Sequence, residues 1–130
     1  MTEPIGDDRG RFAKSLNRAI NIGEAGDLAQ AVELLSTLVE EFSEAASARG
    51  YLAWFQLQLG RQREAIEQSR HAVCLAPGSE KASLIHFHVL WKSAKHIEAL
   101  DEMKRFLMIR PSQVYTEIIK EWEPHLEGDE

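Results

Sequence analysis

The chain has 130 residues, of which 44% are hydrophobic and 28% are charged, and its formal net charge is −6. That hydrophobic content suffices for one folded domain, whereas an acidic chain without a stripe of lysine and arginine suits neither nucleic acid nor an anionic membrane as a partner. The single cysteine excludes an intrachain disulfide and fits a cytoplasmic location.

Residues 1–10 combine a proline, two glycines and three acidic residues, which predicts a flexible N-terminal lead. After residue 10, helix-forming residues dominate, and no segment alternates apolar and polar residues as a half-buried strand does. The sequence therefore predicts an all-α protein. The expected helices span residues 11–24, 28–42, 46–59, 62–75, 80–93, 96–109 and 113–123.

The last expected helix carries its apolar residues on one face, as a helix that caps the end of a stack does. These residues are Val114, Tyr115, Ile118, Ile119 and Trp122. Pro124 is expected to end this helix, because proline cannot donate the next backbone hydrogen bond. Residues 124–130 are then expected to form a solvated acidic tail.

Small residues and turn residues recur at an interval of 34 residues. The recurring sets are Ala31, Ala65 and Ala99, then Gly26 and Gly60, and finally Pro77 and Pro111. The glycines are expected to adopt the left-handed conformation that ends a helix, and the alanines to lie where two helices cross closely. Asp27, Ser79 and Ser112 are expected to cap the helices that follow them.

This helix–turn–helix period resembles the tetratricopeptide repeat (TPR). The central repeat keeps the family pattern best, at Leu52, Ala53, Gly60, Ala65 and Pro77. The resemblance covers about residues 11–111 and implies a single TPR domain, an α-solenoid of three repeats closed by the capping helix 113–123. The repeats are expected at about 11–43, 46–77 and 80–111.

The sequence also departs from the family pattern. Arg49, Gln56 and Ser69 stand where the central repeat usually has aromatic residues. In the third repeat, His86 stands at a leucine position and Ala94 at the position of the turn glycine. The expected core rests on Leu52, Phe55, Ala65, Ala72 and Val73, with Cys74 as a small apolar packing residue.

In TPR proteins the first helix of each repeat lines a concave surface. The resemblance therefore implies a groove lined by Asn17, Ile20, Tyr51, Trp54, Leu57, Ile85, His88 and Trp91. Trp54 and Trp91 should lie about one helical turn apart on the same face, within an aromatic strip. Such a strip is an exposed binding surface, part of the core, or a surface covered by the capping helix or by a second subunit.

The best-known groove chemistry of the family is a clamp for the carboxylates of chaperone tails. The corresponding positions here hold Leu16, Ile20, Tyr51, Lys81 and Ile85, and of these Lys81 alone fits. The resemblance therefore implies a protein–protein interaction module that binds an apolar or amphipathic peptide or helix in the groove. The alternative is a self-associating scaffold, such as a homodimer, or a dedicated chaperone or immunity-type partner that uses the same groove.

No catalytic constellation is evident in the sequence. His86 and His88 are two residues apart and point to different faces of a helix, so they cannot share a metal ion. Cys74 has no cysteine–histidine motif around it, and no glycine-rich phosphate loop follows a strand. The sequence thus predicts a non-enzymatic protein without cofactor or metal, whose partner is another protein or a peptide.

Overall fold

The computed structural model describes residues 7–128, with the side chains of residues 8–122. Within this range the chain forms seven α-helices and no strand. They are α1 (Asp7–Glu24), α2 (Leu28–Glu41), α3 (Ala46–Gln58), α4 (Gln62–Leu75), α5 (Glu80–Lys92), α6 (His96–Leu107) and α7 (Gln113–Gly128). The all-α prediction is confirmed, and six of the helices pair as three successive hairpins.

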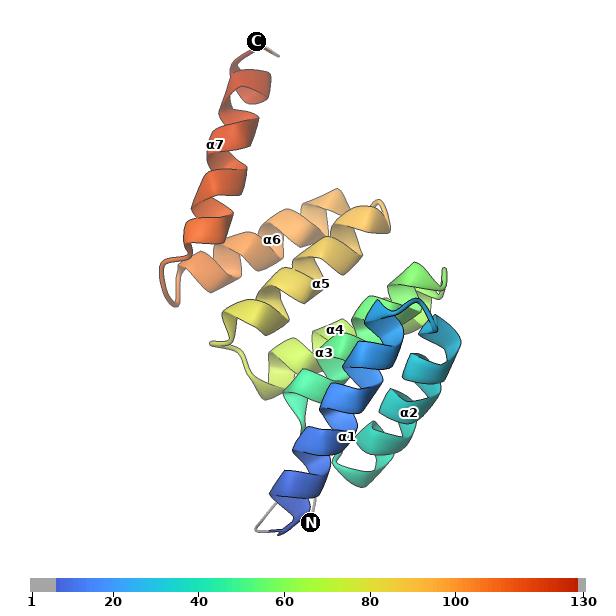
Figure 1. Cartoon of the computed structure of the whole chain (residues 1–130). Coiled ribbons are helices and arrows are strands. Elements are labelled where there is room, and N and C mark those ends of the chain that lie inside the picture. The colour runs from blue at the N-terminus through green and yellow to red at the C-terminus, as the bar shows by residue number, and fades with distance from the viewer. Residues whose placement is uncertain (1–6, 129–130) are drawn as a thin grey trace.

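The hairpins stack into an α-solenoid (Figure 1). Helices α1, α3 and α5 contact one another in sequence and form what we call the inner layer, while α2, α4 and α6 pack on their hairpin partners as the outer layer. Helix α7 follows the third hairpin and stands at a steep angle to α5 and α6. The predicted solenoid of three TPR-like repeats with a further C-terminal helix is confirmed.

The turns between hairpin helices follow the sequence signals. Gly26 and Gly60 have φ angles of 108° and 83°, a left-handed conformation that glycine adopts without steric cost. The side chains of the predicted capping residues accept backbone hydrogen bonds at the first turns of the following helices. These bonds run from Gln30 N to Asp27, from Ala82 N to Ser79 and from Tyr115 N to Ser112.

Ala94 holds the third turn in the same left-handed conformation, with a φ of 62°. A left-handed alanine brings its Cβ too close to the neighbouring carbonyl, at a cost of about 1 kcal/mol relative to glycine. We therefore expect Ala94→Gly to raise the free energy of unfolding by about 0.5–1 kcal/mol. The opposite substitution at the equivalent turn, Gly60→Ala, should lower the free energy of unfolding by at least as much. Urea unfolding followed by circular dichroism measures both changes, and equal destabilisation by both would contradict the assignment of strain to Ala94.

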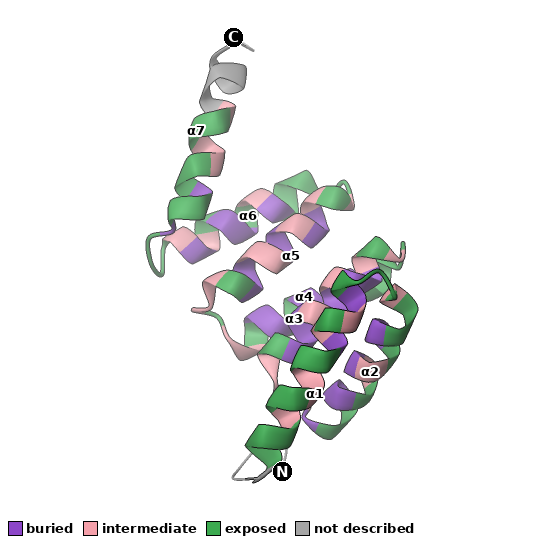
Figure 2. Cartoon of the chain, in the orientation of Figure 1, coloured by how far each residue is buried: buried purple, intermediate pink, exposed green. Residues whose placement is uncertain are grey.

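Buried residues lie mainly on the helix faces where the two layers meet (Figure 2). The predicted core is confirmed: Leu52, Phe55 and Ala65 are at most 2% exposed, and Ala72 and Val73 are also buried. Close approach of the hairpins depends on small residues as well as large ones. A Cβ added to Gly23 would lie 2.4 Å from the ring of Phe55, so glycine is required at that crossing.

The N-terminal boundary differs from the prediction. Helix α1 begins at Asp7, so the flexible lead predicted for residues 1–10 is wrong for residues 7–10, and residues 1–6 lie outside the described residues. Acidic residues in a first turn favour a helix because they face its positive end. Arg11 then pairs with Asp8 and with Glu41 of α2, at 3.3 Å and 2.6 Å, which ties the early turns of α1 to its partner.

The C-terminal boundary also differs, because α7 continues to Gly128 instead of ending before Pro124. A proline removes one backbone hydrogen bond, and a helix can continue past it with that bond missing. Most of the predicted tail 124–130 is therefore helical, with residues 129–130 outside the described range. The packing role predicted for Cys74 is wrong as well: its side chain is exposed, on the face of α4 turned away from the core.

Candidate binding groove

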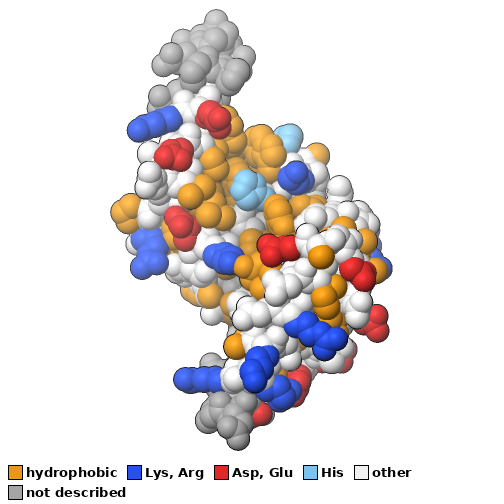
Figure 3. Space-filling view, viewed as in Figure 1, with side chains coloured by type: hydrophobic (Ala, Val, Ile, Leu, Met, Phe, Trp, Pro, Cys, Tyr) orange, Lys and Arg blue, Asp and Glu red, His pale blue; other side chains and the backbone are white. Residues whose placement is uncertain are grey.

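The large side chains predicted to line a groove on α3 and α5 share one face of the inner layer, and each is half-buried. We call this set the groove strip: Tyr51, Trp54, Leu57, Ile85, His88 and Trp91. Hydrophobic side chains gather on this face beside α7 (Figure 3). The strip crosses the border between two hydrophobic clusters, since Tyr51 and Trp54 pack on the first cluster, and Ile85 and Trp91 on the second.

Ring contacts connect the strip between neighbouring repeats. Trp54 of α3 meets His88 of α5 edge to face, with ring centroids 6.4 Å apart. His88 in turn contacts Phe87, whose ring stacks with Trp91 at 6.0 Å. Burial, together with the charge of Lys92, lowers the pKa of His88, so its ring is neutral at physiological pH and forms part of an apolar surface.

Helix α7 covers one end of the strip. Trp122 stacks on Trp91 with ring centroids 4.9 Å apart and planes inclined by 22°. Trp91 also contacts the ring of His96 at 4.2 Å, so aromatic groups from α6 and α7 both pack on it. The sequence left open whether the strip is exposed, part of the core or covered, and the structure shows that α7 covers Trp91. Trp54, in contrast, contacts no aromatic ring of α7 among the described residues.

The other end of the strip carries a positive charge. Lys81 lies over the ring of Tyr51, with Nζ 4.6 Å from the centroid, and also donates a hydrogen bond to the Tyr51 hydroxyl. Next to this pair, a pocket of about 90 Å³ opens between the first turns of α3 and α5. Its walls include Gly50 and Ile85, which makes it a small apolar pocket beside a cation.

The two predicted groove residues of α1 are less closely connected to the strip. Asn17 is exposed and Ile20 is half-buried, and neither is part of the two hydrophobic clusters. Sequence reasoning in turn missed Phe87, His96 and Trp122 as neighbours of Trp91. A usable signal existed for Trp122, which lies on the apolar face of its helix together with Ile118 and Ile119.

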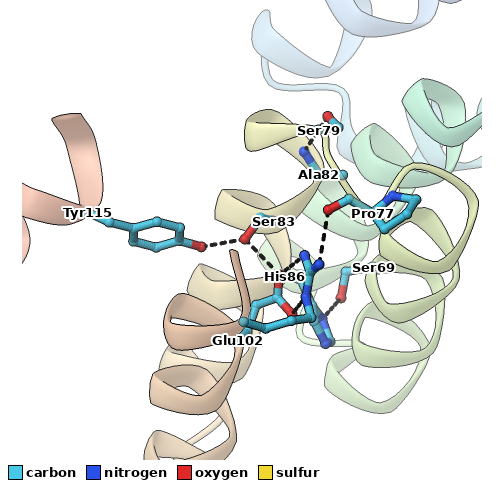
Figure 4. Close-up of polar contacts among 9 residues, drawn as sticks. Ser69, Pro77, Ser79, Ala82, Ser83, His86, Glu102 and Tyr115 are labelled. Carbon is cyan, nitrogen blue, oxygen red and sulfur yellow. Dashed lines mark hydrogen bonds and ion pairs between the residues drawn. The ribbon is translucent and has the colours of Figure 1, made fainter. Parts of the chain in front are cut away.

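Beneath the strip, the positions that depart from the TPR pattern hold polar groups in the interior. Ser69 is 0% exposed, and its Oγ lies 2.7 Å from Nδ1 of His86 (Figure 4). Since Ser69 also donates to the Ile66 carbonyl, we assign Nδ1 of neutral His86 as the donor to Ser69. A hydroxyl buried to this extent cannot reach a substrate, so Ser69 and His86 do not act as a nucleophile and its base. Their hydrogen bond instead joins α4 to α5.

A second polar group joins the third repeat to α7. Ser83 donates to Glu102 at 2.6 Å and shares a hydrogen bond with the Tyr115 hydroxyl at 2.7 Å (Figure 4). One period earlier, Arg49 donates to Gln68 from the equivalent pair of positions. The two repeats thus place a polar link between their helices at the same points.

Acidification tests the interior position of His86. Burial lowers its pKa below the usual value of 6.5, so the unfolded chain binds a proton more readily than the folded chain. The free energy of unfolding should therefore fall as the pH decreases from about 6.5, by up to about 1.4 kcal/mol per pH unit. His88 acts in the same direction.

The His86→Leu variant carries the residue that occupies the equivalent position 52, and it leaves the bond of Ser69 to Ile66 in place. We expect this variant to lose less stability than the wild type between about pH 7.5 and about pH 5.5 in urea titrations. An equal loss in both proteins would show that His86 does not titrate on unfolding.

Among the described residues, no three histidine, cysteine, aspartate or glutamate side chains form a group that could hold a metal ion. None of the helices in the same range is long and apolar enough to cross a membrane.

Comparison with known proteins finds similar folds among solved structures. No protein-family model matches the sequence, and no curated protein matches it. Among solved structures, the second TPR of Spaghetti (RPAP3) bound to an HSP90 peptide has a TM-score of 0.68 at 17% identity, over 76% of this chain and 92% of that one. A mutant of MamA gives 0.67 at 21% identity, over 82% and 78%.

The Yersinia enterocolitica type III secretion translocator chaperone SycD, in an alternative dimer, has a TM-score of 0.73 at 14% identity. The alignment covers 90% of this chain and 89% of that one. At such low identities the likeness concerns the fold, and the fold is TPR-like, as the repeat pattern indicates.

Proposed function

We propose that this chain is a non-enzymatic interaction module whose groove strip binds an apolar or amphipathic segment of a protein partner. The observation that carries the proposal is the half-exposed aromatic surface at Tyr51, Trp54 and His88. The core of the solenoid is supplied by other residues, so the fold does not need large aromatic side chains at these positions. Aromatic side chains of this kind are the usual anchors of protein interfaces.

The contact between Trp91 and Trp122 indicates the chemistry of the ligand. In this contact an amphipathic helix of the chain itself packs its apolar face, with Ile118 and Ile119, on one end of the strip. A partner helix with large apolar residues three or four positions apart would find similar partners around Trp54. The RPAP3 repeat, which shares this fold, was solved with a peptide bound.

A second candidate is self-association through the same strip, in a homodimer or in a dedicated chaperone of one secreted protein. SycD, a chaperone with this fold, was solved as a dimer. Both candidates use the same face, so the same substitution tests them. A cytoplasmic location and an adaptor role belong to the proposal, the first supported by the single cysteine and the second by the TPR-like fold with its half-buried groove strip.

The test uses a displayed library of amphipathic helical peptides, selected against the full chain. We expect Trp54→Ala to weaken the selected peptides by about 2 kcal/mol, or roughly 30-fold, because Trp54 is an anchor at the open part of the strip. Ile97→Ala is the matched control, since Ile97 is 77% exposed on α6 of the outer layer. Titration calorimetry gives both affinities, and circular dichroism verifies that both variants are folded.

Light scattering on the same variants separates the two candidates. A wild-type dimer that dissociates in Trp54→Ala would identify self-association as the use of the strip. Equal affinities for Trp54→Ala and Ile97→Ala, with no change in oligomeric state, would contradict both candidates.

A further inference from the structure

A cleft of about 590 Å³ lies on the outer layer, between α4 and the turn that joins α5 to α6. Helix α4 contributes Arg63, Ile66, Glu67 and Arg70 to its walls, and the turn contributes Ser93 and Lys95. Because these elements belong to the outer layer and its turn, the cleft is separate from the groove strip on α3 and α5.

The cleft concentrates positive charge in an acidic protein. Arg63, Arg70 and Lys95 are exposed, and none of their three side chains forms a hydrogen bond or ion pair with another described residue. Glu67 is the acidic residue among the lining side chains, so three cations face one carboxylate within the cleft. Arg70 also borders a neighbouring hollow that Glu98 and Asp101 line. Three cations around one cleft give it a positive potential, which an external anionic group would complement.

The repeat pattern does not require these cations. One period earlier, the positions of Arg63 and Arg70 are occupied by Ala29 and Ser36. That neighbouring repeat folds into the same hairpin without either charge. The basic residues are therefore a property of this cleft and not of the solenoid.

The turn beside the cleft departs from local rules in three consecutive residues. Ser93 replaces the equivalent Leu59, and its buried Oγ has no hydrogen-bond partner among the described residues. Ala94 takes the left-handed conformation, and Lys95 occupies the N-cap of α6, where its side chain has no acceptor for a capping bond. Residues that lower the stability of a fold, such as strained or unpaired ones, are expected where a surface serves binding.

The spacing of the charges defines the ligand. Arg63 and Arg70 are seven residues apart on one face of α4, which separates their attachment points by about 10 Å. Cations so far apart suit several anionic groups along a chain better than one phosphate. Ile66, between them, provides an apolar floor. We propose that this cleft is a second binding site, which takes an acidic, aspartate- and glutamate-rich segment of a protein partner with an apolar residue seated on Ile66.

Fluorescence anisotropy of the full chain with a short labelled peptide tests this proposal. The probe peptide has aspartates and glutamates around one central leucine, and its neutral twin carries asparagine and glutamine instead. We expect the acidic peptide to bind more tightly than its twin at low salt and to weaken as salt is added. The triple variant Arg63→Gln/Arg70→Gln/Lys95→Gln should lose about tenfold in affinity or more.

The matched control is Lys14→Gln/Lys104→Gln/Lys120→Gln, which removes the same charge from exposed positions outside the cleft. We expect this control to bind nearly as the wild type does, and Glu67→Gln to bind about two- to threefold more tightly, a gain that misfolding cannot produce. Trp54→Ala should leave the affinity unchanged, because the strip lies on the other layer.

Three outcomes would overturn the proposal. The first is equal binding of the acidic peptide and its neutral twin, and the second is an equal loss in the control triple variant. The third is tighter binding of a labelled single-stranded DNA than of the acidic peptide at the same salt concentration, which would assign the cleft to nucleic acid.

Discussion

Replacing Tyr115 with alanine is expected to lower the free energy of unfolding by about 3–5 kcal/mol and to release α7 from the stack. Tyr115 lies in the first turn of α7 and is 0% exposed, the largest of the side chains buried to this degree. Its ring contacts Phe87 at 5.5 Å and Phe106 at 6.0 Å. Its removal leaves a cavity between α5, α6 and α7 that these rings cannot fill.

The hydroxyl and the ring of Tyr115 can be separated. Tyr115→Phe keeps the ring and removes the hydrogen bond to Ser83, for which we expect a loss of about 1 kcal/mol. Burial raises the pKa of the Tyr115 hydroxyl above its usual value of 10, so the group stays protonated and can take part in this bond throughout the physiological range. The difference between the two variants then measures the packing of the ring.

Urea unfolding gives the stabilities, and amide hydrogen exchange reports on α7. In Tyr115→Ala the amides of residues 116–122 should lose protection before those of α3 and α4, since the base of the helix is no longer held. If the alanine variant matches the phenylalanine variant in both measurements, α7 is held by the contact between Trp91 and Trp122 and not by its base.

The backbone of the solenoid follows from local signals in the sequence. Gly26 and Gly60 mark two turns by the conformation that only glycine adopts freely, and Asp27 caps α2 with its own carboxylate. Each of these signals acts within a few residues, so no knowledge of the packing is needed to interpret it. The period of 34 residues then extends a single hairpin to the whole stack.

The polar interior could be predicted only in part. Ser69 and His86 were recognisable as departures from the TPR pattern, but the bond between them joins residues 17 positions apart and depends on side-chain rotamers. The link from Arg49 to Gln68 recurs one period later as the link from Ser83 to Glu102. Comparison of the two repeats could have indicated that second link.

The candidate groove was predictable at α3 and α5 and not at α7. The contact between Trp54 and His88 follows from the stacking of equivalent helices, which the repeat fixes. The contact between Trp91 and Trp122 depends on the angle at which α7 leaves the last repeat. Helix α7 begins 33 residues after α5, close to where the period would start another first helix, yet it stands at a steep angle to α5 and α6 (Figure 1). The period therefore predicts where α7 begins in the sequence and not how it packs.

Replacing Arg105 with leucine is expected to cost about 3 kcal/mol of stability. Arg105 holds the carboxylate of Glu102 with two hydrogen bonds, from Nε at 2.8 Å and from Nη2 at 2.7 Å. It also donates to the Pro77 carbonyl at 3.0 Å, which ties α6 to the loop between α4 and α5. The Glu102 side chain is 7% exposed, so without Arg105 its charge stays in the interior with Ser83 as its remaining donor.

The double variant Glu102→Gln/Arg105→Leu shows whether the loss of stability comes from the unpaired buried charge or from the lost contacts of Arg105. Glutamine carries no charge and can still accept the hydrogen bond of Ser83, so the double variant should recover most of the stability that the single variant loses. Lys104→Leu is the surface control, with an expected change within about 0.5 kcal/mol, because Lys104 is exposed. Urea unfolding of the three variants would contradict this explanation if the double variant were no more stable than Arg105→Leu. In that case the loss would come from the bond to Pro77, and the pair of Arg105 and Glu102 would contribute little to holding the third repeat together.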